Sequence, residues 1–126
     1  MNKLLLLLSF FYCVSSHAEW SLFHTAEDKS QFFINPETLL VVDGNKRIWI
    51  LNEFDQANAQ GTKSFRSIEE YDCINPQSRV MQIAAFKGSM ATGQLLAKQH
   101  GSGQWKPIQA GSVEEMIREK VCSPSQ

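Results

Sequence analysis

The C-terminal segment, SVEEMIREKVC over residues 112–122, predicts a short helix that ends on a cysteine. Ser112 and Glu115 have the spacing of a capping box, in which two side chains satisfy free backbone N–H groups of the first helical turn. We expect Glu114 and Arg118 to pair along the outer side of this helix. Residues at helical spacing leave one mainly apolar side, which the rest of the protein must cover: Val113, Met116, Ile117, Lys120 and Val121.

The N-terminus, MNKLLLLLSFFYCVSSHAEW, has the pattern of an export signal. A positive charge, an apolar stretch and then small residues predict a secretory signal peptide over residues 1–18, cleaved between Ala18 and Glu19. The apolar stretch is short for crossing a bilayer, and a retained N-terminal anchor is the alternative. Bulky aromatic residues directly before Cys13 disfavour lipid attachment at that cysteine. We therefore expect Cys13 to leave with the signal peptide.

The remaining cysteines are Cys73 and Cys122. In an exported protein an even pair predicts one disulfide bond, and two separate buried thiols are the alternative. Loss of chain entropy gives a bridge across about 50 residues roughly 4 kcal/mol of stabilisation. Small domains have a net stability of only about 5–15 kcal/mol. Such a bridge would therefore hold the C-terminal helix to the body of the protein and supply a large share of its stability.

Length and charge limit the classes of function. Residues 19–126 are enough for one domain with a real core. The chain has 12 Lys and Arg against 13 Asp and Glu, a formal net charge of −1. It therefore lacks the strong basic field that recruits nucleic acid or anionic lipid. No later segment is apolar enough to be a transmembrane segment of the mature chain.

Short segments of β-forming residues, separated by turn residues, predict an antiparallel meander. Turns are expected at Asn35-Pro36, which ends one strand before the next begins, and at Asp43-Gly44-Asn45, which makes a hairpin. Residues 92–100 favour helix by composition, but the neighbouring hairpins favour a strand. We expect Trp105 to plug a loop. The predicted strands are residues 20–24, 31–34, 39–42, 46–55, 62–74, 79–87 and 92–100. The predicted fold is α+β, with an antiparallel sheet of about six strands packed by one C-terminal helix.

Alternation along residues 62–74 assigns side chains to the two faces of the predicted sheet. Tyr71 and Cys73 point the same way, towards the core, together with Glu69. Glu70 points the opposite way, with Arg66. Glu69 and Glu70 therefore cannot act on one substrate bond, and their simplest interpretation is structural.

Motifs that would indicate an enzyme are missing from the sequence. It contains no G-x-S-x-G, H-E-x-x-H or C-x-x-C, and GSMATGQ lacks the lysine of a phosphate-binding loop. Only His24 and His100 remain after the predicted cleavage, far apart in the sequence. We therefore predict a non-enzymatic protein without a cofactor or a metal site.

Several segments together resemble the bacterial surface-adhesin protein E family. They are, in order, FFINPETL, KRIWIL, FRSIEEYDC, KGSMATGQ, WKPIQAGS and the final VC. The resemblance implies an exported surface-adhesin E-like domain over residues 19–126, with an antiparallel sheet, a C-terminal helix and a Cys73–Cys122 bridge. It also implies adhesion to host extracellular-matrix proteins. The adhesin that gives the family its name resembles a lipid-anchored protein. Because this chain lacks such an anchor motif, we expect a periplasmic or secreted form.

The predicted function is that of an adhesin-like binding module that engages a protein partner of the host matrix or of the cell envelope. The contact is expected at a sheet edge or at the loop over residues 55–63. Arg47, Lys63 and Arg66 are candidate binding residues for an acidic partner, and a solvated surface is their alternative interpretation. The alternative function is a periplasmic accessory protein with a small-ligand pocket between sheet and helix, lined by His24 or His100.

Overall fold

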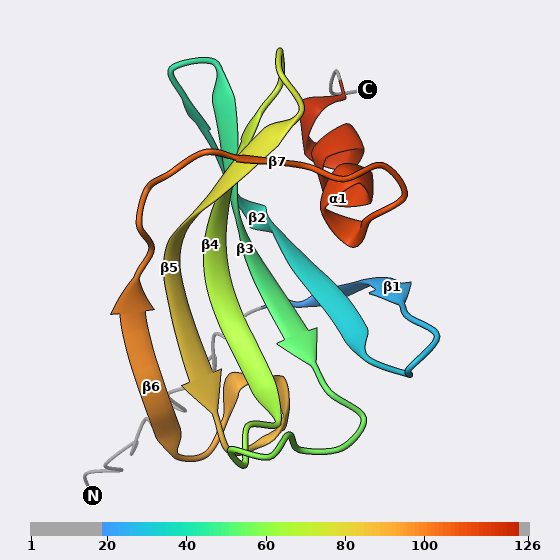
Figure 1. Cartoon of the computed structure of the whole chain (residues 1–126), viewed down its shortest axis with the longest axis vertical. Helices are drawn as coiled ribbons and strands as arrows, with labels where there is room; N and C mark the ends of the chain where they lie inside the picture. Colours follow the sequence, from blue (N-terminus) through green and yellow to red (C-terminus); the bar gives the residue numbers. More distant parts are fainter. Residues whose placement is uncertain (1–18, 124–126) are drawn as a thin grey trace, which may run out of the picture.

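A computed structural model describes residues 19–123. Its main element is a curved antiparallel sheet with one α-helix against it (Figure 1). The strands are β1 (Ser21–Thr25), β2 (Gln31–Val42), β3 (Asn45–Glu53), β4 (Ser64–Asp72), β5 (Gln77–Phe86), β6 (Leu95–His100) and β7 (Lys106–Pro107). The helices are the 3₁₀ turn η1 (Ser89–Ala91) and α1 (Val113–Cys122). The predicted fold class is confirmed.

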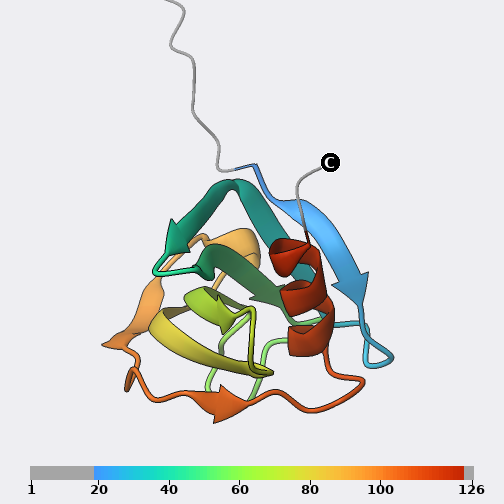
Figure 2. The same ribbon diagram turned by 90° about the horizontal axis from the view of Figure 1, so that it is seen from above.

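The strands follow one another as a meander in the order β1-β2-β3-β4-β5-β6. The two-residue strand β7 pairs with the start of β5, so the chain after β6 continues along the same edge of β5. Seen from above, the strands wrap around the middle of the molecule (Figure 2), and the closest contacts of α1 with the sheet are to β3 and β4. Residues 92–100 were expected as a strand, and β6 confirms this expectation over its six residues.

Strand β2 corrects one prediction. Asn35-Pro36 does not end a strand, because β2 continues to Val42, although its pairing with β3 is irregular between Asn35 and Leu40. Thr38 explains how the chain passes this point. Its hydroxyl donates to the carbonyl of Asn35 at 2.6 Å and accepts the N–H of Trp49 on β3 at 3.0 Å. A side chain thus replaces the backbone bonds lost around proline, which lacks an N–H.

The turn between β2 and β3 has the geometry that its sequence predicts. Val42 pairs with Asn45, so Asp43 and Gly44 form a two-residue loop. Their φ angles are 51° and 81°. A tight hairpin turn of this kind needs positive φ at both central residues, and aspartate and glycine tolerate that conformation best.

Helix α1 packs on the sheet through fewer residues than its sequence predicts. The Ser112 hydroxyl accepts the N–H of Glu115 at 3.2 Å, which confirms the N-terminal cap. Ile117 and Val121 are buried, whereas Met116 is 37% exposed. The two buried residues join a core cluster on β2, β3 and β4, formed by Ile34, Ile48, Ile50 and Tyr71.

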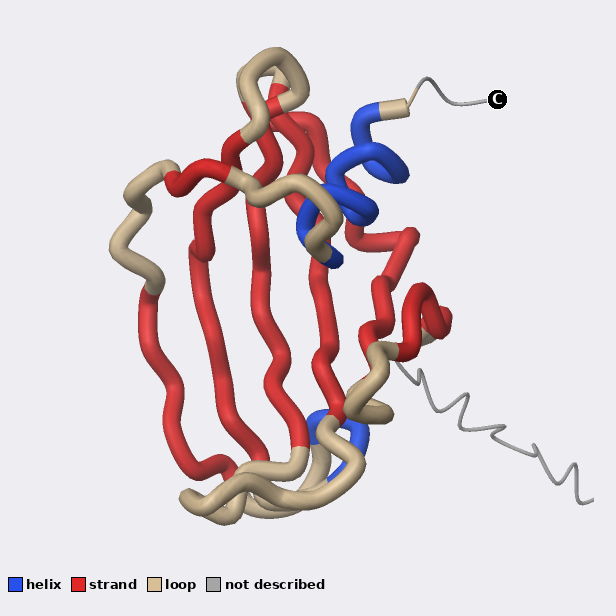
Figure 3. The backbone as a smooth tube through the Cα atoms, turned by 45° about the vertical axis from the view of Figure 1, so that its right-hand side comes forward, coloured by secondary structure: helices blue, strands red, loops and turns tan. Residues whose placement is uncertain are grey.

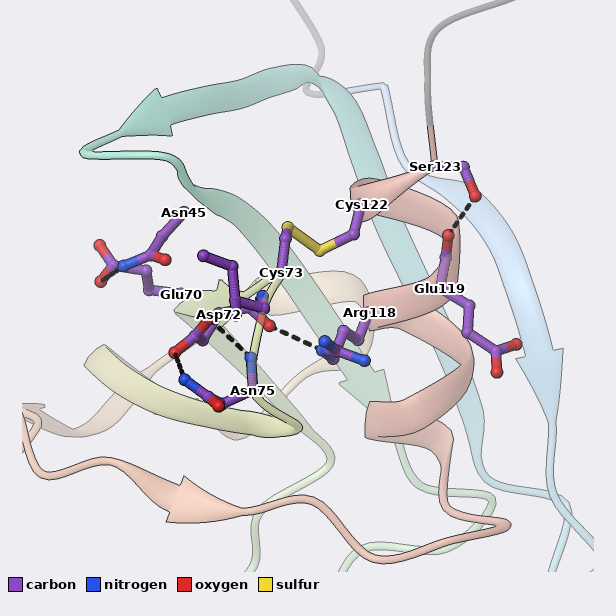
Figure 4. The surroundings of a disulfide bond; sticks show 10 residues. Asn45, Glu70, Asp72, Cys73, Asn75, Arg118, Glu119, Cys122 and Ser123 are labelled. Atoms are coloured by element: carbon purple, nitrogen blue, oxygen red, sulfur yellow. Dashed lines mark hydrogen bonds between the residues drawn. A yellow bond between two sulfur atoms is a disulfide. The ribbon is translucent and has the colours of Figure 1, made fainter.

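A disulfide bond between Cys73 and Cys122 joins the residue after β4 to the last residue of α1 (Figure 4). The two Cα atoms are 5.5 Å apart, an ordinary separation for a disulfide. The predicted bridge is confirmed. Beside it, Arg118 does not make the predicted ion pair with Glu114. Instead its Nε donates to the carbonyl oxygen of Asp72 at 2.6 Å, a second link between α1 and the end of β4.

Helix α1 covers only one end of the sheet. It lies near the end where the β2–β3 and β4–β5 turns are found, and the strands run well past it towards the opposite end (Figure 3). The part of the helix-bearing face beyond the N-terminus of α1 is therefore not covered by the helix. Trp105 was expected to plug a loop; it lies half-buried with the Arg79 guanidinium 4.4 Å from the centre of its ring.

Candidate functional site

Adjacent residues of β4, Glu69 and Glu70, lie on opposite faces of the sheet, as the alternation predicts. Glu69 faces α1, because it lines the same cleft as Val113 and Ile117. Glu70 faces away from α1, where it meets Arg47 from β3. The two faces can therefore be compared through two residues of the same type.

Glu70 is fully buried and is paired with two arginines. Its carboxylate pairs with the Arg47 guanidinium, and it is 2.7 Å from Nη2 of Arg79. Nε of Arg79 also donates to Glu70, at 2.9 Å. A buried carboxylate is tolerated when cations and hydrogen-bond donors replace its water. Here two arginines on the flanking strands do so.

Glu69 has hydrogen-bond donors but no cation. The Tyr71 hydroxyl donates to its Oε2 at 2.8 Å, and the Ser67 hydroxyl donates to its Oε1 at 3.3 Å. Among residues 19–123, no Lys, Arg or His nitrogen lies within 4.0 Å of this carboxylate. Burial raises the pKa of Glu69. The hydrogen bond from Tyr71 opposes that rise, and the negative charge of Glu114 adds to it. Burial and the neighbouring Glu69 raise the Tyr71 pKa well above its ordinary value.

Two open clefts meet at Glu69. One, of about 140 Å³, lies beneath the first turn of α1 and has both apolar and polar side chains in its walls. The other, of about 310 Å³, lies towards β7 and is lined by Lys106. Glu69 and Glu114 line both clefts. The apolar walls of the first cleft are Phe32, Ile50, Phe65, Ile83, Val113 and Ile117, and Asn52 and Ser67 add polar groups. A third cleft of about 230 Å³ continues along β4, β5 and β6.

The three basic candidates from the sequence do not form one patch. Arg47 is held by Glu70. The Arg66 guanidinium lies over the rings of Trp49 and Phe86, 5.1 and 5.3 Å from their centroids. The Lys63 ammonium donates to two backbone carbonyls at the start of the loop after β3 and is 4.0 Å from the Glu53 carboxylate. Each side chain thus has a structural partner, and a binding role for these three residues stays a prediction.

The two histidines also lie apart. His24 is on β1 and His100 is on β6, at opposite ends of the strand order. Neither lines any of the three clefts. Over residues 19–123, no group of three His, Cys, Asp or Glu side chains is placed to hold a metal ion. The sequence suggested, as an alternative, a pocket between sheet and helix, but it did not predict that Glu69 and Glu114 would line the clefts found there. Alternation along β4 does place Glu69 on the correct face.

Comparison with known proteins decides the family. The chain matches the surface-adhesin protein E family over residues 20–123. The chain belongs to the surface-adhesin protein E family. This family consists of adhesins, a non-enzymatic kind of protein, so the chain is an adhesin-like surface protein. A comparison with curated protein sequences gives no significant match.

Two solved structures of the family's namesake, Haemophilus influenzae protein E, have a similar fold. The selenomethionine form is 10% identical, with a TM-score of 0.63 over 80% of this chain and 84% of that one. Crystal form II is 11% identical, with a TM-score of 0.60 over 72% of this chain and 79% of that one. The likeness at such low identity concerns the fold. Among residues 19–123 there is no helix long and apolar enough to span a membrane.

Proposed function

We propose that the chain is an exported, non-enzymatic binding module that holds a protein partner, either of the host extracellular matrix or of the cell envelope. Membership of the adhesin family supports the class of function. Export is part of the proposal: residues 1–18 act as the signal peptide, and cleavage falls between Ala18 and Glu19. The signal peptide lies outside the described residues.

The outer edge of β2 carries this proposal. β1 pairs with β2 only over residues 31–34, so the second half of β2 has no strand on its outer side within residues 19–123. This half is also apolar: Leu40 is 60% exposed and Val41 is 66% exposed, with Leu39 exposed beside them. An apolar edge with unpaired backbone groups is suited to pair with an extended segment of another chain.

Two other surfaces are less suited to this role. The loop over residues 55–63 is tied to itself, because the Asn58 side-chain oxygen accepts the N–H groups of Gln60 and Thr62. The opposite sheet edge, β6, also exposes leucines but carries Lys98 and His100 after them. Charged edge residues discourage strand pairing. We therefore place the partner at β2.

Two substitutions test the edge. Leu40→Lys with Val41→Lys puts charge on the unpaired half of β2 without touching the core. We expect at least a tenfold loss of binding to immobilised basement-membrane extract, or to an envelope extract if the partner lies there. Leu95→Lys with Leu96→Lys on β6 is the matched control and should bind as the wild type does. Equal loss in both variants, or in neither, would contradict the placement.

Cell fractionation separates the two kinds of partner. A protein found only in the periplasm cannot reach host matrix, and the envelope partner would then be the correct version. Detection of the protein at the cell surface or in the medium supports the matrix version. Retention in the cytoplasm, with residues 1–18 uncleaved, would contradict export.

The alternative function, an accessory protein with a small-ligand pocket, stays a prediction. Its expected lining by His24 or His100 is not found in the clefts beside α1. The clefts themselves have a different chemistry, which leads to a separate inference.

A further inference from the structure

We propose that the cleft between the first turn of α1 and strand β4 binds an alkylammonium group, with Glu69 as its counter-ion. The ligand class is a primary amine on a short apolar chain, either a free amine or the side chain of a lysine. The site is distant in sequence from the β2 edge at Leu40 and Val41, and it does not depend on the partner proposed there.

Charge balance is the first argument. Removing a carboxylate from water is costly unless a cation or a set of donors replaces the water. The fold does so for Glu70, which has two arginines. The next residue on the other face, Glu69, has two neutral hydroxyl donors and no cation within 4.0 Å among residues 19–123. Glu69 is half-buried beside open clefts, so a cation from solution can reach its carboxylate.

Other charged groups around the cleft favour a cation. Glu114 on α1 lines both clefts and adds a second negative charge. Lys106 on β7 lines the larger cleft, but it makes no ion pair with either glutamate. The Tyr71 hydroxyl on β4 donates a hydrogen bond to Glu69. Tyr71 stays neutral, because burial holds its pKa well above the ordinary value. Two carboxylates therefore face one lysine.

Hydrogen-bonding capacity is the second argument. Each carboxylate oxygen accepts more than one hydrogen bond, so Glu69 retains acceptor sites after its bonds to Tyr71 and Ser67. Asn52 lines the same cleft, and its side-chain oxygen is shielded from water without a donor among the described residues. An ammonium group supplies three N–H donors and no acceptor. These three donors are complementary to the acceptor oxygens of Glu69 and Asn52.

The walls give the third argument. Phe32, Ile50, Phe65 and Ile83 line the cleft together with Glu69 and give it apolar surface. A cavity needs about 10–15 Å³ to hold one water molecule, so a cleft of about 140 Å³ accepts a chain of several carbon atoms. Aromatic faces also attract cations. A methylene chain along these walls and an ammonium at Glu69 would use both kinds of surface.

The test is an NMR titration of the processed chain, residues 19–126, with n-butylammonium chloride at neutral pH. We expect saturable shifts of the Glu69 side-chain carboxyl carbon and of the Tyr71 ring. n-Butanol, which has the same chain without the charge, should bind at least tenfold more weakly. Glu69→Gln should weaken n-butylammonium binding at least tenfold. In this variant the NMR signals of Phe65 and Asn52 report the binding. Glu119→Gln, on the exposed side of α1, is the control and should change nothing.

Two outcomes would overturn the site: equal binding of n-butanol and n-butylammonium to the wild type, or unchanged binding in Glu69→Gln. The first comparison needs no variant, so it stands even if a substitution alters the fold. An Nα-acetyl-lysine amide distinguishes the two sources of the amine. If it binds as well as n-butylammonium, the natural ligand is a lysine side chain. If only n-butylammonium binds, the site takes a free amine.

Discussion

The two faces of the sheet cover their side chains, including one glutamate each, in different ways. On one face, α1 covers apolar residues, a disulfide holds the helix, and Glu69 is left without a cation beside open clefts. On the other face, side chains of the sheet cover each other, with Glu70 between two arginines and Arg66 over two aromatic rings. A covering helix brings apolar burial but leaves space at its end. On the opposite face the carboxylate of Glu70 is taken up by the two arginines.

The largest expected effect is on the helix-bearing face. Cys122→Ser removes the bridge that closes a separation of 49 residues. The free energy of unfolding should fall by about 4 kcal/mol, and the melting temperature by roughly 15 °C or more. Thermal unfolding followed by circular dichroism measures both. Reductant added to the wild type should reproduce the effect, and Ser123→Ala should not. A shift of a degree or two would show that the bridge contributes little.

On the opposite face, Glu70→Gln leaves Arg47 and Arg79 close together without their shared carboxylate. Breaking a buried ion pair costs about 3–5 kcal/mol, and we expect the lower end because both arginine side chains remain partly exposed. Urea unfolding at neutral pH measures the loss. An unchanged midpoint of unfolding would mean that the cluster is not a stabilising feature of this face.

Glu69→Gln is the same substitution one residue away, and its effect should be small. The glutamine keeps an acceptor for the Tyr71 hydroxyl and removes a charge that has no counter-ion. We expect a change below about 1 kcal/mol, or a gain in stability, at neutral pH. A loss as large as that of Glu70→Gln would remove the contrast between the faces.

The pH dependence of stability, measured for the wild type and for Glu69→Gln, tests the contrast between the two faces in a second way. Because the folded-state pKa of Glu69 lies above the ordinary 4.5, the folded protein holds this proton more tightly than the unfolded chain. The contribution to stability is therefore present below pH 4.5 and is lost as the pH rises through the folded-state pKa. The wild type should lose stability over this window relative to Glu69→Gln. Parallel stability curves would contradict the raised pKa.

The smallest effect is expected at Asp72, where β4 ends. Its carboxylate accepts the N–H groups of Ile74 and Asn75 and the side chain of Gln77, and these bonds lower its pKa from 3.8 to about 2. Its contribution to stability is present above pH 3.8 and is lost as the pH falls through about 2. Carboxyl NMR titration should find that midpoint. Asp72→Asn should flatten the acid limb of the stability curve only slightly.

Local patterns predicted the fold where one short segment determines the outcome. The Asp43-Gly44 turn, the cap at Ser112 and the alternation along β4 all depend on neighbouring residues, and each is confirmed. The predicted break at Asn35-Pro36 was wrong because Thr38 replaces the lost backbone bonds with a contact to another strand. The local pattern does not show such a contact.

The candidate site was less predictable because it depends on distances across the sheet. Arg118 was expected to contact Glu114 four residues away, but the bridge brings it to the Asp72 carbonyl instead. Similarly, alternation places Glu69 on the helix-bearing face, but only the limited reach of α1 along the sheet opens the clefts beside it. The two arginines at Glu70 come from strands that flank β4, 23 and 9 residues away along the chain.

The disulfide also sets how the protein responds to mechanical tension. A pull between the two ends of the chain passes from Cys122 straight to Cys73, so β5, β6, β7 and α1 carry none of it. Only the stretch from Glu19 to Cys73 can unravel. With about 3.4 Å gained per residue, the tether would lengthen by about half as much as an unbridged chain. A protein that holds onto a surface under flow would thus extend only through β1 to β4, and the disulfide would limit how far its ends can separate.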